Sequence, residues 1–488
     1  MFDDEDIDDY FDEEQDRKAA IERYEDMLQS HDTAYFDSSE FEYIIDNYVE
    51  KNQLRLSREA VDLAIQQHPE SSMLKIKEAR QYLLENQPEK AFEILQHVEH
   101  DEEETPDYFL VLGGCLAALG QSQEALENYL SALPYFDEDE KFDLYNAIAY
   151  EYQQLQNFKL ALEFYEKALP LANDYLNERD TLYHEIRACY FAEGRKEDAI
   201  VFFQRLVDEN PHNSKAWTNI GDCYRMMGEY EESIDPYEFA LAIDPEDIWT
   251  NMHLADIYYD LGRYQEAIDT LEEALRNGVE TSIIHTSLGD CYYRLNNLET
   301  AKEHFQKAVD MNEMNGGGWA GLGYICSDCG DSKKAIQYFE KAFNLEPWET
   351  EHLYSIAADY HKLNRLDLSM KYLRKIQEMN PRDPDSYYYI ADLYGEMDQV
   401  DEAINTLQYG LQQTDNAPLL LYLLAYAYFL KGQRTKGLDT LDCALDADFE
   451  SYIDFLEYDR ELLANDTEII ELIAQHKQNQ ETTNTNNE

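Results

Sequence analysis

The sequence lacks an apolar run long enough to cross a membrane. Its longest apolar run, Leu419 to Leu430, has twelve residues, whereas a transmembrane helix needs about 20. The N-terminus, Met1 to Asp6, is acidic and shows neither the basic start nor the apolar core of a secretory signal. We therefore expect a cytoplasmic protein that does not insert into membranes.

Cysteine is also scarce, with seven residues in a chain of 488. An odd and scattered set suits reduced thiols and argues against a disulfide framework. Cys326 and Cys329 have the spacing of half a zinc site, but no second pair supplies the four ligands that structural zinc requires. A redox role would need a strand before this segment, and none is expected. We expect neither a metal nor a cofactor.

Positive charge is the third shortage. The chain has 39 Lys and Arg residues against 103 Asp and Glu residues, a formal net charge of −64. Such a surface repels the phosphates of nucleic acids and anionic membranes, and it favours basic partners. Apolar residues still make up 44% of the chain, enough for a continuous core, and 39 of them are tyrosine. The expected partner is a basic protein or peptide, without direct binding of nucleic acid or membrane.

Catalytic motifs are missing as well. The sequence contains no nucleophile elbow, no phosphate-binding loop and no His-Glu-x-x-His segment. Gly316, Gly318 and Gly321 match the dinucleotide-binding pattern by letter, but that pattern works only after a strand, and here a helix is expected. The consecutive glycines instead favour a local hinge. We predict no catalytic residues and no enzyme.

What the sequence does have is a repeat of 34 residues. The clearest unit begins at Ser214 and carries Trp217, Ile220, Gly221 and Tyr224 at fixed spacing. The same order returns as Leu254-Ala255-x-x-Tyr258 and again as Leu288-Gly289-x-x-Tyr292. Equivalent units begin at positions 38, 72, 106, 142, 180, 214, 248, 282, 316, 350, 384 and 418, with two extra residues before 142 and four before 180.

This pattern resembles the tetratricopeptide repeat family, whose 34-residue unit is a helix, a turn and a second helix. The resemblance implies an all-α, right-handed superhelical solenoid of about twelve units with a C-terminal capping helix. The predicted segments are an acidic, largely disordered N-terminal part that can include a short helix (1–37), irregularly spaced units (38–179), regular units (180–451), a helical cap (452–476) and a disordered polar tail (477–488).

Columns of small side chains explain how such helices pack. The eighth position is small in most units, although Ile45 and Arg187 depart from this, and the twentieth is small in all twelve. The twentieth-position residues are Ser57, Ala91, Ala125, Ala161, Ala199, Ser233, Ala267, Ala301, Ala335, Ser369, Ala403 and Gly437. Small residues let helix axes approach to about 8–10 Å. Bulky residues at positions 11 and 24 then fill the core. Pro236 lies inside a second helix, where we expect a kink.

The resemblance also implies which residues line the inner wall, namely first-helix positions 2, 5, 9 and 12 or 13. The candidate partner-binding residues at these positions are Asp222, Trp249, Asp256, Tyr259, Asp260, Asp290, Tyr293, Tyr354, Tyr388 and Asp392. One interpretation is a groove of carboxylates and aromatic rings for a basic, extended peptide. The other is that an acidic protein has acids everywhere, with Arg225 and Arg294 neutralising part of the wall. Binding of a peptide's terminal carboxylate, as in chaperone-binding members, is not expected because aspartates would repel it.

The last unit differs, because Leu419, Tyr422, Tyr426 and Phe429 form one apolar stripe at the same inner positions. An apolar surface of this size marks an interface. Its occupant is either the chain's own cap, from Tyr452 onward, or an amphipathic helix of another protein.

These observations favour a cytoplasmic, non-catalytic scaffold that binds a basic protein or peptide. One alternative is an acidic mimic or chaperone that shields basic nucleic-acid-binding proteins, mainly through residues 1–16. Another is an autoinhibited adaptor, in which this acidic segment folds back onto the wall or the stripe.

Overall fold

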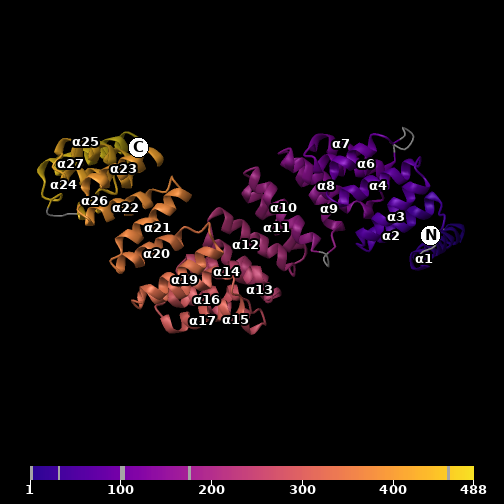
Figure 1. Cartoon of the computed structure of the whole chain (residues 1–488), viewed down its shortest axis with the longest axis horizontal. Coiled ribbons are helices and arrows are strands. Elements are labelled where there is room, and N and C mark those ends of the chain that lie inside the picture. The colour runs from indigo at the N-terminus through magenta and orange to yellow at the C-terminus, as the bar shows by residue number, and fades with distance from the viewer. Residues whose placement is uncertain (1–3, 31–32, 99–104, 174–176, 459–461, 488) are drawn as a thin grey trace. The chain divides into compact units, whose positions relative to one another are not determined.

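The computed structural model describes residues 4–30, 33–98, 105–173, 177–458 and 462–487, with side chains for all of these except 4–14, 458 and 479–487. Helices and short turns account for the described residues, and no strand occurs among them (Figure 1). The chain divides into two compact units, Met1–Ile243 and Asp244–Glu488. We call them the N-terminal and the C-terminal unit.

The helices are bounded as follows. The N-terminal unit contains α1 (Asp4–Ser30), α2 (Ser38–Glu50), α3 (Leu54–Gln67), α4 (Ser72–Leu84), α5 (Pro88–Leu95), α6 (Pro106–Ala118), α7 (Ser122–Ala132), η1 (Leu133–Tyr135), η2 (Glu138–Glu140), α8 (Phe142–Gln154), α9 (Phe158–Ala168), η3 (Leu169–Leu171), α10 (Glu178–Ala192), α11 (Lys196–Glu209), α12 (Ser214–Met227) and α13 (Tyr230–Ile243). The C-terminal unit contains α14 (Ile248–Asp260), α15 (Tyr264–Arg276), α16 (Ser282–Arg294), α17 (Leu298–Met311), α18 (Gly316–Asp328), α19 (Ser332–Leu345), α20 (Glu351–Lys362), α21 (Leu366–Met379), α22 (Pro384–Glu396), α23 (Val400–Gln413), α24 (Pro418–Leu430), α25 (Arg434–Ala447), α26 (Tyr452–Tyr458) and α27 (Thr467–Asn487).

The helices from α2 to α25 form twelve consecutive pairs, and their first helices begin where the repeat predicts. Ten begin at the predicted residue, whereas α10 begins at Glu178 and α20 at Glu351. The two expected insertions fall between pairs, where η1 and η2 separate α7 from α8 and η3 follows α9. The all-α helix–turn–helix fold predicted from the 34-residue period is therefore confirmed.

The predicted packing columns are also present. All twelve twentieth-position residues are buried. The structure links the eighth position to the twenty-fourth. In four units a glycine at position 8 lies against an aromatic ring at position 24, in the pairs Gly113–Tyr129, Gly221–Tyr237, Gly289–Phe305 and Gly323–Phe339. In each pair a Cβ on the glycine would lie 2.6–2.7 Å from a ring carbon. Alanine pairs with the smaller leucine in units such as Ala255–Leu271, whereas Tyr165 and Phe203 at position 24 have Ala149 and Arg187 at position 8.

The glycines of α18 serve packing, and the hinge that we predicted there is wrong. Residues 316–328 form one helix, which Asn315 caps by accepting a hydrogen bond from the backbone N–H of Gly318 at 2.6 Å. A Cβ on Gly321 would lie 2.3 Å from Cε1 of Phe305, so this ring needs a glycine on α18 as well as one on α16. The helix α17 precedes the segment, so the strand that a dinucleotide site requires is replaced by a helix.

The N-terminal segment was predicted to be largely disordered, but residues 4–30 form the helix α1. Residues 1–3 and 31–32 lie outside the described part. Ala20 and Tyr24, four residues apart on one face, are fully buried. The ring of Tyr24 lies 5.6 Å from that of Phe36 and 6.1 Å from that of Tyr48. Our prediction weighed the acidic charge of the segment and missed this short apolar face, which packs on α2.

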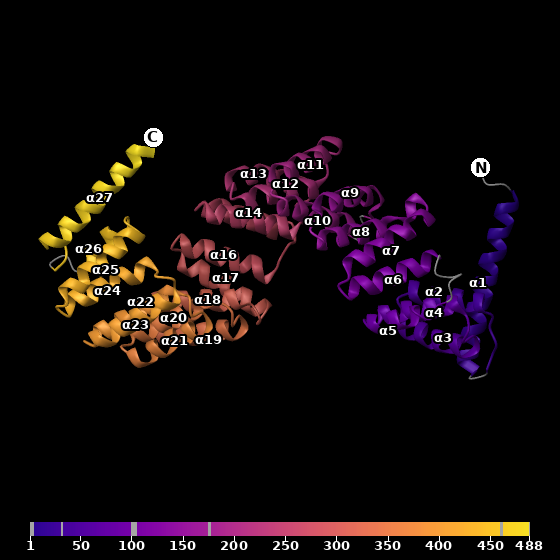
Figure 2. The same cartoon turned by 90° about the horizontal axis from the view of Figure 1, so that it is seen from above.

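The C-terminal cap is longer than predicted. Two helices, α26 and α27, follow the last pair, and α27 continues to Asn487 through the tail that was predicted to be disordered (Figure 2). Arg434 of α25 donates to both carboxylate oxygens of Asp466 at 2.7 Å and to Glu468 at 2.8 Å. Buried Ile469 and Ile473 join the core of the last repeats, as expected of a cap that covers the final apolar face.

Candidate functional site

Most of the predicted wall residues belong to the first helices of the C-terminal unit. We call the surface formed by α14, α16, α18, α20 and α22 the first-helix wall (Figure 2). Asp256 and Tyr259 of α14 line a cavity of about 260 Å³ together with Asp290 of α16. Tyr354 of α20 and Asp392 of α22 line a second cavity of about 550 Å³. The structure thus groups five predicted residues at two cavities.

Aromatic side chains connect the helices between these cavities. The hydroxyl of Tyr293 on α16 donates to Asp328 of α18 at 2.7 Å. The ring of Tyr293 lies 6.3 Å from that of Tyr324, which is also on α18. Tyr324 stands at position 9, like Asp256 and Asp290, and our list of acidic positions missed it. Reading the column for aromatic as well as acidic residues would have found it.

The carboxyl of Asp290 lies in an unfavourable place for a negative charge. It is largely enclosed in the smaller cavity, and among the described residues none donates a hydrogen bond to it or forms an ion pair with it. Burial and the nearby carboxylate of Asp256 raise the pKa of Asp290 to about 7. A positive charge placed in this cavity would stabilise both carboxylates.

We expect the stability of the chain to depend on pH through Asp290. Its pKa in the unfolded chain is 3.8, so the folded state binds the proton more tightly, and this stabilisation is lost as pH rises from 3.8 to about 7. The Asp290→Asn variant, which stays neutral, should therefore gain about 3 kcal/mol of stability relative to the unchanged chain between pH 5 and pH 8. Urea unfolding of both proteins at the two pH values measures this difference, and a difference that does not change with pH would contradict the assignment.

Asp222 does not belong to an open wall, contrary to our prediction. It lies in the N-terminal unit, and only 5% of it is exposed. Its carboxylate forms an ion pair with Arg187 at 2.8 Å and accepts a hydrogen bond from the Tyr237 hydroxyl at 2.7 Å. Arg187 occupies the eighth position of the preceding unit, where most units have a small residue, and it reaches across to Asp222. The pair is therefore part of the interior of this unit.

Three other predicted residues lie away from the cavity linings. Trp249 is 69% exposed at the start of α14, where its ring lies 6.5 Å from that of His253. Asp260 is exposed at the end of the same helix. Tyr388 is half-buried against the core, and its neighbour Tyr389 lines the larger cavity instead. Adjacent residues on a helix point in different directions, so Tyr388 lies against the core while Tyr389 lines the cavity.

The apolar stripe of the last unit is covered, at its centre, by the chain's own cap. Only 2% of Tyr422 is exposed, and its ring lies 5.4 Å from that of Phe455 in α26. Its hydroxyl donates to the backbone carbonyl of Asp448 at 2.5 Å. The other members, Leu419, Tyr426 and Phe429, are half-buried. Of the two occupants that we considered, the structure has the cap against Tyr422.

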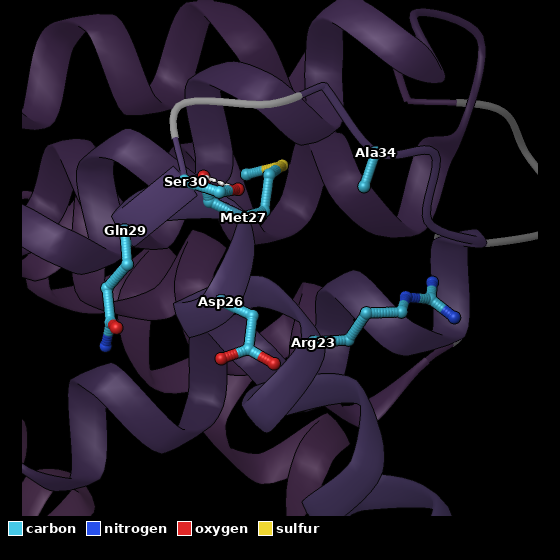
Figure 3. Close-up of a pocket in the computed structure, with 6 residues that line it drawn as sticks. All are labelled: Arg23, Asp26, Met27, Gln29, Ser30 and Ala34. Carbon is cyan, nitrogen blue, oxygen red and sulfur yellow. Dashed lines mark hydrogen bonds between the residues drawn. The ribbon is translucent and has the colours of Figure 1, made fainter.

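A further cavity, of about 520 Å³, lies beside the C-terminal end of α1 (Figure 3). Arg23, Asp26 and Met27 of α1 line it, together with Ala34 from the segment that follows. Arg23 already donates to Glu40 at 2.7 Å and to the carbonyl of Tyr35 at 3.1 Å. Its guanidinium is therefore engaged in holding α1 to α2, which leaves Asp26 as the other charged residue of the lining.

The remaining chemical features are structural. Cys115, Cys189, Cys223 and Cys291 are buried, and burial raises the pKa of each thiol. Across the described ranges, no three His, Cys, Asp or Glu side chains are grouped so as to hold a metal ion. In the same ranges, no helix has the length and apolar character that crossing a bilayer requires.

Comparisons with known proteins extend these observations. Sequence models of the tetratricopeptide repeat match residues 142–175, 188–213, 213–278, 246–314, 317–347, 353–383 and 385–409. Among solved structures, the chain is similar to the APC/C hetero-tetramer Cut9–Hcn1, with 17% identity and a TM-score of 0.40 over 86% of this chain and 94% of that one. It is also similar to pilF of Pseudomonas aeruginosa, with 18% identity and a TM-score of 0.37 over 44% of this chain and 97% of that one. The third is YrrB, described as a TPR protein with an unusual peptide-binding site. The identity is 21% and the TM-score 0.31, over 38% of this chain and 96% of that one. No curated protein matches the chain.

Proposed function

Because the chain belongs to the tetratricopeptide repeat family, we propose that it is a non-catalytic, cytoplasmic scaffold whose first-helix wall binds a basic, extended segment of another protein. The repeats use most of the chain to build a surface and not a catalytic pocket. The fold supports an interaction scaffold in general, and the chemistry of the wall supports the basic partner.

The observation that carries the proposal is the cavity at Asp256 and Asp290. It holds two facing carboxylates beside the ring of Tyr259 and has no cation among its lining residues. A Lys or Arg side chain of a partner would bring a positive charge to these carboxylates, and its methylene stem would pack against the ring. The net charge of −64 would also attract such a partner from a distance.

Two basic residues near the wall, Arg294 and Lys362, are held by other groups. Arg294 donates to the hydroxyl of Tyr264 at 2.8 Å, and its guanidinium lies over the rings of Tyr259 and Tyr264. Lys362 donates to the hydroxyl of Ser327 at 2.6 Å. Because both cations are held by other groups, the wall keeps an excess of negative charge.

Capture of partners on two charge-matched variants tests the proposal. In Asp256→Asn/Asp290→Asn the wall loses two carboxylates, whereas Glu273→Gln/Glu303→Gln loses two exposed carboxylates from the second helices α15 and α17. We expect proteins with basic segments to be retained from the native cell by the unchanged chain and by the second variant, and to be lost from the first. Mass spectrometry identifies them.

Two outcomes would contradict this. If both variants retain the partners equally, the wall carboxylates do not take part in binding. If retention is unchanged in 1 M salt, where the Debye length is about 3 Å, the contact is not electrostatic. Deletion of residues 1–16 tests the alternative of an acidic mimic. It leaves the buried anchors Ala20 and Tyr24 in place, so a loss of partners on this deletion would assign binding to the acidic segment.

A further inference from the structure

The larger cavity of the first-helix wall lies between α20 and α22, where α20 carries the small residue Ala358. Its volume is about 550 Å³, and we call it the tyrosine pocket. Its floor is formed by Ala357, Leu373 and Leu393, which are buried in the core. At position 9 the helix α20 has Ala358. The equivalent residues on the other first helices of this unit are Asp256, Asp290, Tyr324, Asp392 and Tyr426. Each of them would fill space that Ala358 leaves open.

Two aromatic rings form one side of the tyrosine pocket. Tyr389 is 47% exposed, although its ring packs edge-on against Tyr354 at 5.7 Å and against Tyr388 at 5.2 Å. The hydroxyl of Tyr354 donates to the carboxylate of Asp383, which holds that ring in place. An exposed aromatic residue supported in this way loses little conformational entropy when a ligand packs against it.

The mouth of the tyrosine pocket is acidic. Glu351, Asp385 and Asp392 line it, and none of the described residues hydrogen-bonds to their carboxylates or forms an ion pair with them. Burial and the neighbouring Glu396 raise the pKa of Asp392, while burial and Asp383 raise the pKa of Asp385. Burial is the larger cause of both shifts, and His361 partly opposes the shift of Asp392.

The two basic residues at the pocket are engaged elsewhere. The ammonium group of Lys362 donates to Ser327 and lies 3.6 Å from buried Asp359. The imidazole Nε2 of His361 lies 2.9 Å from Glu396. Neither group approaches the acidic mouth closely enough to form an ion pair there, so the pocket combines an apolar floor, an aromatic side and an uncompensated negative mouth.

We propose that the tyrosine pocket binds the side chain of an arginine in the partner segment, an inference that rests on the proposed function. The arginine stem packs on Leu373 and Leu393, and the planar guanidinium stacks on Tyr389 while it pairs with Asp385 or Asp392. Arginine fits better than lysine because its planar group can stack on a ring and form two parallel hydrogen bonds to a carboxylate. A carboxylate of the partner, whether from an Asp or Glu side chain or from its C-terminus, would be repelled.

A seven-residue peptide tests this directly. The probe is acetylated and amidated Gly-Ser-Gly-Arg-Gly-Ser-Gly, compared with the same peptide carrying citrulline, which has the shape of arginine without its charge. Ligand-observed NMR at physiological salt should give binding of the arginine peptide that is about tenfold tighter than that of the citrulline peptide, as expected for losing one charge-assisted hydrogen-bonded pair.

Variants of the full chain locate the binding. Ala358→Tyr fills the pocket without changing charge, and tyrosine occupies the same position in Tyr324 and Tyr426, so the helix should accept it. It should weaken arginine binding about tenfold or more, as should Asp385→Asn/Asp392→Asn. The charge-matched control Glu402→Gln/Asp439→Asn, with both changes on exposed residues of α23 and α25, should leave binding unchanged. Circular dichroism checks that each variant is folded.

The outcomes separate this inference from the scaffold proposal. Equal binding of the arginine and citrulline peptides, or equal binding by the unchanged chain and Ala358→Tyr, would overturn the inference. If basic proteins are nevertheless captured through Asp256 and Asp290, the scaffold proposal stands without it. If the arginine peptide binds in the pocket but no basic protein is captured, the pocket is supported and the scaffold proposal fails.

Discussion

The Asp222→Ala variant is expected to destabilise the N-terminal unit by about 3–5 kcal/mol, because it leaves a buried guanidinium without its counter-charge. The side chain of Arg187 is 11% exposed and that of Asp222 is 8% exposed, so water cannot replace the lost partner. The hydroxyl of Tyr237, which donates to the same carboxylate at 2.7 Å, would also lose its acceptor. Urea unfolding followed by circular dichroism measures the loss.

Two comparisons identify its cause. Asp235→Ala removes an exposed carboxylate from α13 in the same unit and should change stability by less than about 0.5 kcal/mol. Arg187→Ala/Asp222→Ala removes both charges and restores a small residue at position 8, so its loss should be smaller than the sum of the two single losses. Additive losses would mean that the pair does not contribute as an ion pair.

The Gly289→Ala variant should destabilise the C-terminal unit by about 1–3 kcal/mol through overpacking. Its new Cβ would lie 2.6 Å from Cδ1 and Cε1 of Phe305, a buried ring that also lies against Gly321 on the next first helix. The ring cannot move away without meeting that second glycine. Phe305→Leu should rescue the variant, since Ala255 and Leu271 form this smaller pair in the preceding repeat. Thermal and urea unfolding of the single and double variants measure the coupling.

The control for this prediction is Gly395→Ala in α22. A Cβ there would meet no atom within 4 Å, and the residue lies inside a helix. Alanine should therefore raise stability by about 0.5–1 kcal/mol through its higher helix propensity. If Gly289→Ala were as harmless as Gly395→Ala, the link between positions 8 and 24 would be wrong.

The repeat itself could be predicted because its determinants are local in the sequence. A period of 34 residues and an unbroken column of small residues at position 20 set where each helix begins and which face is buried. These patterns need no knowledge of distant contacts, and they placed the first helices within two residues of their observed starts. The acidic character of position 9 could likewise be read as a column, because it depends only on counting within each unit.

The tertiary structure decided what each member of that column does. Asp222 and Asp290 occupy the same repeat position, yet Asp222 is paired because the preceding unit places Arg187 beside it, whereas Asp290 meets Asp256. The open pocket beside Ala358 and the covering of Tyr422 by Phe455 also depend on neighbours in other helices. The sequence by itself therefore determined the fold and the columns of its surface. Only the packing of adjacent repeats decided which charges are compensated, because charge and burial depend on residues one repeat away.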